Sequence, residues 1–509
     1  MNRTFRLFSG VVASTCLLAS PALAQSRPTD GDWLVIVGGT VIDGNGGAPQ
    51  PDTSVLVKGN RIEKIGARAS ITVPKGAKVI DAAGKFLTPG FVDTNVHVSL
   101  YGGGGKDRKE TSVFYRDASA KLTLEAAQMH LRYGITTIRD SYGALLPLIE
   151  VRDAIKRGDA IGPRMLVAGN IVGWGGPYSI SFALIRESDL SLYEEQFTDF
   201  ITQGTGEELS DLYPEELRVV INKYLDKGPD FIKYGATTHW NFPTFIGFSP
   251  EQQKVIVDET HKRNRSAEVH ATNPEGLRLS IEAGIDLIQH PEVLADREMS
   301  DALVAAIRER RIVGSMLVNT FTGEAWKKHQ KDREAALRRL EEQAKQAADS
   351  GLRVPVVRQK TSAERRREQA EVGLSIEMRR RNAKKLIDAG CILTLGTDNY
   401  AGSAPEFSRS PKPPWQEPGL GTIIAIEGLV EMGMTPSQAI VSATKNGAIA
   451  NRASKDIGTL EAGKLADILV LDADPLAEIS NIRKLGVLIM DGKVIDHRKL
   501  PTEPVMFKR

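Results

Sequence analysis

The sequence has 509 residues, of which 66 are Lys or Arg and 64 are Asp or Glu, so its net charge is close to zero. Such a balance gives no basic surface for nucleic acid or anionic membranes, and an aromatic content of 6% offers few stacking platforms for bases or sugars. We therefore expect a small-molecule substrate and no nucleic-acid partner.

The first 24 residues have the three-part layout of a secretory signal peptide. Arg3 and Arg6 precede an apolar stretch, which leads to the small-residue pattern Ala22-Leu23-Ala24. The apolar stretch is too short and too interrupted to span a bilayer. We expect cleavage after Ala24, no membrane association afterwards, and a periplasmic or secreted protein. Cys391 would then be the one cysteine left, which rules out an intramolecular disulfide.

Both ends of the mature chain are rich in β-forming residues. Alternating apolar segments separated by Gly and Asn turns occupy residues 33–37, 40–44 and 54–62, and again residues 466–471 and 487–495. This pattern predicts a small β-sandwich domain formed by both termini, residues 25–90 plus 451–509, with the rest of the chain inserted into it.

The middle of the chain alternates helices and strands. Helical patterns at 122–133, 274–283 and 382–389 each stop at a glycine and lead into an apolar strand. The strand candidates are residues 91–93, 135–138, 165–168, 230–232, 267–269, 286–288, 311–313 and 391–395. Eight such strands predict an α/β fold with a (β/α)8 TIM-like barrel over residues 91–450.

A charged segment at about residues 325–381 interrupts this alternation. It is dense in Lys, Arg, Glu and Gln, with Leu337, Leu340 and Ala344 at helical spacing. One interpretation is a solvated helical insertion between the last two strands. The alternative is a lid or an oligomer contact over the active site, because loops at that face of a barrel carry function.

Polar side chains follow the predicted strands at the ends where barrel enzymes place their active sites. They are Asn95 and His97 after the first strand, Lys233 after the fourth, His270 after the fifth, His290 after the sixth and Asp398 after the eighth. Each alone has a structural explanation; Asp398, for example, could be a helix N-cap. Together they favour one opening that binds a catalytic divalent metal and leaves a position for water. Tyr178, Tyr234 and His239 are expected to line the substrate pocket beside it.

Several longer motifs resemble the amidohydrolase superfamily, particularly its imidazolonepropionase-like and Xaa-Pro dipeptidase-like branch. They are residues 87–93 (LTPGFVD), 281–286 (IEAGID), 395–398 (LGTD) and 458–467 (GTLEAGKLAD). The resemblance implies one or two divalent ions, zinc being the expected metal, held by His97, His270, His290, Asp398 and a carbamylated Lys233. It also implies that Asp398 is the catalytic base, and that a homo-oligomer is compatible with this fold.

One position departs from the family pattern. The family begins with His-x-His, whereas this chain has Asn95-x-His97. An amide oxygen is a weaker donor than imidazole toward zinc-like metals, so the first metal position would be weak or absent. Relatives that hydrolyse phenylureas and thiocarbamates resemble this chain in carrying Asn-x-His, so activity is still expected.

The function that the sequence predicts is hydrolysis of an amide-type C–N bond by metal-activated water, in an N-acyl amino acid, dipeptide, anilide, urea or carbamate. Two alternatives stay open. The same site would suit a lactone or other ester hydrolase, and the Asn95 departure leaves room for a non-catalytic periplasmic binding protein.

Overall fold

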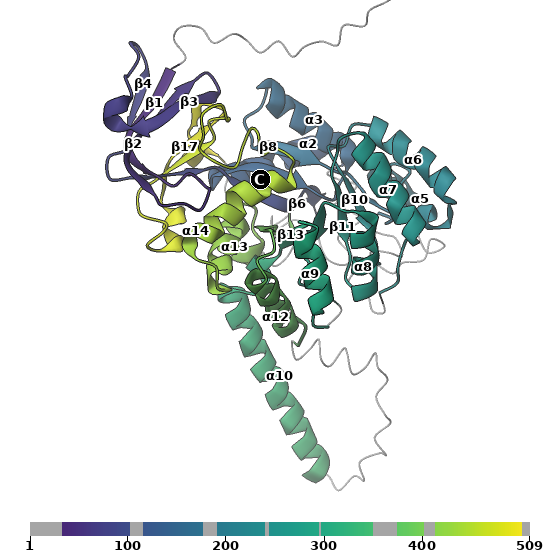
Figure 1. Ribbon diagram of the computed structural model, residues 1–509. Helices are drawn as coiled ribbons and strands as arrows, with labels where there is room; N and C mark the ends of the chain where they lie inside the picture. The colour runs from purple at the N-terminus through teal and green to yellow at the C-terminus, as the bar shows by residue number, and fades with distance from the viewer. Residues whose placement is uncertain are drawn as a thin grey trace, which may run out of the picture.

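The structure is a computed structural model that describes residues 33–101, 116–176, 191–239, 244–294, 297–349, 374–401 and 413–500. It shows a β-sheet domain beside a larger body of helices and parallel strands (Figure 1). The predicted signal peptide lies outside the described residues, as do the side chains of Leu340 and Ala344. Within the described part of the chain, no helix is both long and apolar enough to cross a membrane.

The β-sheet domain draws its strands from both ends of the chain, as the sequence predicts. Its eight strands are β1 (Trp33–Val41), β2 (Gln50–Lys58), β3 (Arg61–Ala67), β4 (Lys78–Asp81), β5 (Phe86–Pro89), β16 (Ile468–Leu471), β17 (Leu485–Met490) and β18 (Lys493–Ile495). They pair in the order β18-β17-β16-β5-β1-β2-β3, with β4 also on β1. The two ends meet where β5 pairs antiparallel with β16, for example Thr88 with Leu469.

This pairing refines the sandwich prediction. Hydrogen bonding runs through one eight-stranded sheet and does not divide it into two separately paired sheets. Alternate residues of β1, such as Leu34 and Ile36, join Val55, Ile468 and Val470 in a single buried cluster. Alternation in a strand places every second side chain on the same face, which is why the apolar pattern of both termini can be buried together.

The larger body is built from parallel strands. They are β6 (Phe91–Tyr101), β7 (Ile135–Asp140), β8 (Arg164–Val167), β9 (Ile171–Val172), β10 (Ile232–Gly235), β11 (Ala267–His270), β12 (Leu287–Gln289), β13 (Val313–Met316), β14 (Leu393–Leu395) and β15 (Asn399–Ala401). Each of the eight predicted strands overlaps one of them. One sheet runs β9-β10-β11-β12-β13-β14 and the other β8-β7-β6-β15.

Two strands of the barrel are each broken into two shorter strands, and the two sheets meet at these breaks. Strands β8 and β9 follow each other within a few residues, as do β14 and β15. In the second gap, the backbone N–H groups of Thr397 and Asp398 donate to the carbonyl of Asn95 on β6. The parallel strands thus occupy eight successive positions, which is the arrangement of a (β/α)8 barrel.

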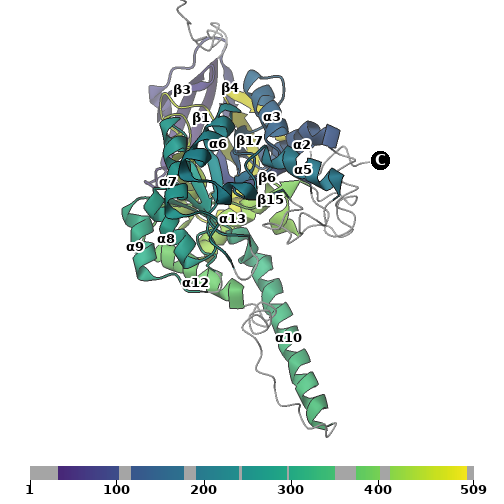
Figure 2. The same ribbon diagram turned by 90° about the vertical axis from the view of Figure 1, so that its right-hand side faces the viewer.

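Helices surround these strands (Figure 2). They are α2 (Ser119–Arg132), α3 (Leu145–Arg157), α5 (Leu192–Thr202), α6 (Pro214–Asp226), α7 (Pro250–Lys262), α8 (Pro274–Ala283), α9 (Asp301–Glu309), α10 (Gly323–Asp349), α12 (Leu374–Asp388), α13 (Leu420–Glu431), α14 (Pro436–Val441) and α15 (Gly447–Ala450). Helix α8 shows how its two ends could be predicted from the sequence. The Asn273 side chain accepts from the N–H of Gly276 at its start, and Gly284 ends it with a φ of 93°.

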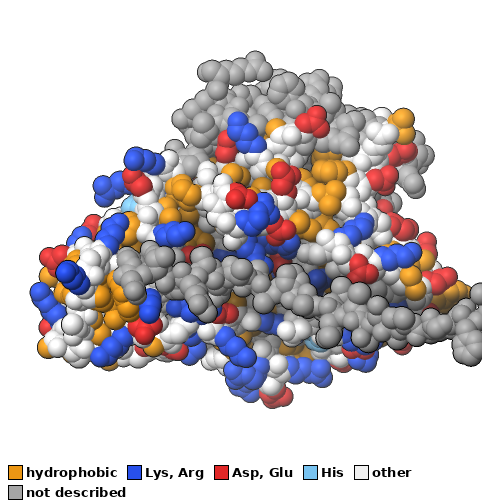
Figure 3. Space-filling model, turned by 90° about the horizontal axis from the view of Figure 1, so that it is seen from above, with side chains coloured by type: hydrophobic (Ala, Val, Ile, Leu, Met, Phe, Trp, Pro, Cys, Tyr) orange, Lys and Arg blue, Asp and Glu red, His pale blue; other side chains and the backbone are white. Residues whose placement is uncertain are grey.

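The described first part of the charged insertion is solvated helix, since α10 extends away from the body (Figures 1 and 2) and Leu337 is exposed. An ion pair between Arg333 and Glu377 links α10 to α12. Acidic and basic side chains are interspersed on the face seen in Figure 3, in keeping with the balanced composition. The last part of the insertion forms the start of α12, and this helix packs against the barrel core.

Candidate active site

The site is built on the carboxyl ends of the parallel strands. In the register of β10 and β11, Lys233 lies opposite Glu268 and Gly235 lies opposite His270. His270 in turn lies opposite Gln289, the residue before His290. Strand β15 continues from Asp398, and its Tyr400 pairs with His97 on β6. Residues far apart in sequence are therefore brought to one end of the strands.

Asp398 is the centre of the polar contacts in this group. Its Oδ1 is 2.7 Å from Nε2 of His97 and accepts a hydrogen bond of 3.1 Å from Nδ2 of Asn95. Burial alone would raise the pKa of Asp398, but the hydrogen bond from His97 and the positive potential of the basic side chains around it hold that pKa below its usual range. Asp398 is thus an ionised acceptor held in a fixed position.

Backbone conformation helps to aim two of these side chains. His290 has a φ of 39° and Asp398 a φ of 56°, both in the left-handed region that few residues other than Gly and Asn adopt. Such a conformation is retained where the surrounding structure fixes it, and it is concentrated at functional sites. His290 directly follows β12, and Asp398 lies between β14 and β15.

Asn95 has both ends of its amide engaged. Its Oδ1 accepts a hydrogen bond from the hydroxyl of Ser141, and its Nδ2 donates to Asp398. Because a carboxylate only accepts, the amide nitrogen must be the end that faces Asp398. In this arrangement Asn95 orients Asp398 and does not present a free oxygen to a metal.

Ser141 is a site residue that the sequence analysis missed. It directly follows β7, a strand to which no functional residue was assigned, and it is completely buried. Its Oγ also accepts a hydrogen bond of 3.3 Å from Nζ of Lys233. Ser141 could have been considered from sequence, because it is the third residue after the second predicted strand, 135–138, and such residues lie at the same opening.

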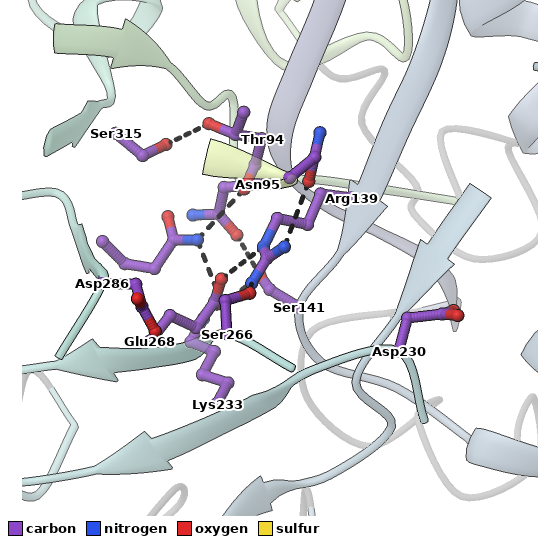
Figure 4. Close-up of polar contacts among 12 residues, drawn as sticks. Thr94, Asn95, Arg139, Ser141, Asp230, Lys233, Ser266, Glu268, Asp286 and Ser315 are labelled. Atoms are coloured by element: carbon purple, nitrogen blue, oxygen red, sulfur yellow. Dashed lines mark hydrogen bonds and ion pairs between the residues drawn. The ribbon is translucent and has the colours of Figure 1, made fainter. Parts of the chain in front are cut away.

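Lys233 is buried among polar groups at the base of this opening. Burial lowers the pKa of its amine, while the charges of Glu268, Asp398 and Asp140 act in the opposite direction. Figure 4 shows Lys233 near a buried ion pair in which Nε of Arg139 donates to Oε2 of Glu268 at 2.6 Å. The lowered pKa favours the neutral amine that carbamylation requires.

Three histidines and one tryptophan form an aromatic group at the opening. The ring centroids of His270 and His290 are 4.6 Å apart, and His239 stacks on His270 at 5.8 Å. Trp174 lies edge-on to His270 at 4.6 Å and donates from Nε1 to the carbonyl of Thr237 at 3.0 Å. His239 therefore lies beside His270, and its contact with a substrate stays a prediction.

Burial keeps these imidazoles neutral. Desolvation lowers the pKa of His290 to about 3 and that of His239 to about 4, and it also lowers the pKa of His270 well below its usual value. A neutral imidazole has the lone pair that a metal ligand or a hydrogen-bond acceptor needs.

Two other expected pocket residues have different outcomes. The prediction for Tyr234 is wrong: its side chain is fully buried, its hydroxyl is 3.1 Å from Oε1 of Gln253 on α7, and its ring packs on Phe248. Tyr234 follows Lys233 directly, and neighbours on a strand point to opposite faces, so Tyr234 faces the outer helices. Tyr178 lies outside the described residues.

The residue types at this opening fit a divalent metal. Neutral imidazoles and an ionised carboxylate are donors that such ions use in proteins. Nδ1 of His97 is buried without a hydrogen-bond partner among the described residues. As they stand in the described part of the chain, no three His, Cys, Asp or Glu side chains are arranged to hold one ion. His97 and Asp398 bind each other directly instead.

Comparisons with known proteins identify the family and the fold. The family model described as "Amidohydrolase family" matches residues 86–495. The ochratoxinase of Aspergillus niger is 25% identical over 472 residues, covering 87% of this chain and 82% of its own. A solved structure of phenylurea hydrolase B is 28% identical with a TM-score of 0.79, covering 94% of this chain and 100% of its own. A structure of molinate hydrolase is also 28% identical, with a TM-score of 0.77 and coverage of 94% and 98%.

Proposed function

This chain belongs to the amidohydrolase family as a hydrolase of C–N bonds, and we propose that it cleaves the amide-type bond of a small molecule with a divalent metal as cofactor. The substrate class is an N-acyl amino acid, dipeptide, anilide, urea or carbamate. The observation that carries the proposal is the ionised Asp398, fixed by His97 and Asn95 beside neutral histidines.

Asp398 supplies the proton transfer in this mechanism. Its Oδ atoms accept the proton of the attacking water and then return it to the nitrogen that leaves when the C–N bond breaks. His97 and Asn95 keep the carboxylate oriented through these two transfers. His239 and Trp174 form a wall beside His270 that confines the substrate and excludes bulk water.

The metal would be held by His97, His270, His290, Asp398 and Lys233. A divalent ion, zinc being the expected one, would supply Lewis acidity toward the substrate carbonyl and lower the pKa of water. For Lys233 we propose carbamylation: the neutral amine attacks carbon dioxide, an N–C bond forms and one proton leaves to solvent. The product is a carboxylate-like ligand in place of the amine.

We further propose that the site binds one ion tightly, because Ser141 already engages the oxygen of Asn95. Elemental analysis of the purified protein is expected to find about one divalent ion per chain. Dialysis against a chelator should abolish hydrolysis across a panel of N-acyl amino acids, anilides, ureas and carbamates, and added zinc should restore it. Full activity in metal-free protein would refute the metal dependence, and two tightly bound ions would refute the role given to Asn95.

The protein is proposed to act in the periplasm or outside the cell, on the basis of the pattern in residues 1–24. Expression of the full sequence in a bacterium with a periplasm is expected to release a chain that begins at Gln25. N-terminal sequencing of the periplasmic and cytoplasmic fractions tests this. An uncleaved chain that stays in the cytoplasm would contradict it.

A further inference from the structure

Arg379 is a cation that the charged insertion brings to the open end of the barrel. It lies on α12, and its guanidinium contacts residues that follow two neighbouring strands. Nη2 donates to the hydroxyl of Thr320 at 2.8 Å, just beyond β13, and lies 3.5 Å from Oε1 of Glu292, just beyond β12. Its Cζ lies 5.0 Å from the ring centre of Phe321. Arg379 therefore sits at the carboxyl ends of β12 and β13, on the side where His290 lies.

The hydrogen-bonding capacity of Arg379 is only partly used. Its hydrogen bond and its ion pair both involve Nη2. Its Nε is buried and has no hydrogen-bond partner among the described residues. A guanidinium has five N–H donors, and a buried donor without a partner is costly. The side chain as a whole retains 17% of its exposure.

Arg139 shows what a structural arginine looks like in the same barrel. Each of its three guanidinium nitrogens donates to a different side chain: Nε to Glu268 at 2.6 Å, Nη1 to Asn451 at 3.1 Å and Nη2 to Ser266 at 3.0 Å. Its side chain has no exposed surface. Arg379 differs on both counts.

The ion pair between Arg379 and Glu292 is long, so Arg379 can also bind a second anion. The distance of 3.5 Å to Glu292 is long for a charge-assisted hydrogen bond. Oε1 of Glu292 is also engaged by the backbone N–H of Leu317 at 3.1 Å. The positive charge of Arg379 acts on both Asp398 and His290, so it lies within electrostatic range of the reacting groups.

We propose that Arg379 binds a carboxylate of the substrate, so that the preferred substrates are amides, peptides or carbamates with a free carboxylate near the scissile bond. The proposal rests on the proposed hydrolysis of a C–N bond at this site. A planar guanidinium can form two parallel, charge-assisted hydrogen bonds with a carboxylate, a group that neutral ureas and anilides lack. Among the substrate classes compatible with the family, Arg379 would therefore favour those with a carboxylate over uncharged ureas and anilides.

The test compares N-benzoyl-phenylalanine with its carboxamide, which differ at the carboxylate alone. Arg379→Gln is the test variant, and Arg380→Gln is the matched control on the same helix. Arg380 contacts the carbonyl of Phe321 and Glu431, and neither contact involves the catalytic group. Binding is measured by calorimetry in an Asp398→Asn background, where turnover is strongly slowed, and kcat/KM is measured with Asp398 intact.

The wild-type residue at 379 is expected to favour the carboxylate over the carboxamide by about 10- to 100-fold in binding, the range for hydrogen bonds to charged groups. Arg379→Gln should remove that preference by weakening the carboxylate alone, and Arg380→Gln should keep it. Equal affinity for the two compounds, no measurable binding of the carboxylate, or an equal loss for both in Arg379→Gln would overturn the proposal. Absence of turnover with a retained binding preference would instead count against the hydrolysis and leave the carboxylate site standing.

Discussion

Replacing Asp398 with Asn is expected to lower kcat by about 100- to 10,000-fold, the range that positioned proton transfer contributes in enzymes. The asparagine side chain has nearly the same shape and can still contact His97 and Asn95, but it cannot accept a proton from water. Because Asn is nearly isosteric with Asp, the loss reflects the missing carboxylate, as base and as proposed metal ligand, rather than a change in packing. The measurement is steady-state hydrolysis of the best substrate in the panel.

A matched control separates this effect from a general loss of charge. Asp388 lies at the end of α12, is largely exposed and pairs with Lys384. Asp388→Asn should leave kcat and KM unchanged, since exposed ion pairs contribute little. Circular dichroism should show the same folded signal for both variants. An Asp398→Asn enzyme with more than about a tenth of the normal kcat would be incompatible with the proton-transfer role.

The positions of the main site residues could be predicted from sequence because they depend on strand ends. Once the segments ending at Lys233, His270 and His290 are identified as parallel strands, their side chains must meet at one edge. The motif LGTD at residues 395–398 identifies the end of the last strand in the same way. The observed strands overlap the predicted ones, but β6 and β10 extend further, so that Asn95 and His97 lie inside β6 and Lys233 lies inside β10.

Other features depend on contacts between residues distant in sequence. Ser141 and Asn95 are separated by 46 positions, and nothing near either residue shows that the hydroxyl engages the amide oxygen. Arg379 looks like one more charge in a solvated helix until the packing of α12 places it beside Thr320. The Tyr234 error is of another kind, since strict alternation with Lys233 was enough to exclude it.

Arg139 and Glu268 lead to the second large prediction, which concerns stability. Both side chains are completely buried, and Oε1 of Glu268 also accepts a hydrogen bond of 3.1 Å from Gln289. The Arg139 guanidinium lies 3.3 Å from the ring centre of Phe231. Removal of one member leaves the other charge buried without its partner, which costs about 3 to 5 kcal/mol. Arg139→Met is therefore expected to lower the free energy of unfolding by that amount, measured as a lower urea midpoint.

The double variant Arg139→Met/Glu268→Leu distinguishes this mechanism from lost packing. If the penalty comes from an uncompensated charge, removal of the second charge should recover a large part of the stability lost in Arg139→Met. Exposed Arg278, which pairs with Glu275 and Glu282, provides the control. Arg278→Met should leave the midpoint unchanged. A double variant that unfolds at a still lower urea concentration than Arg139→Met would show that the side chains stabilise the barrel through their volume and hydrogen bonds, and that their charges are incidental.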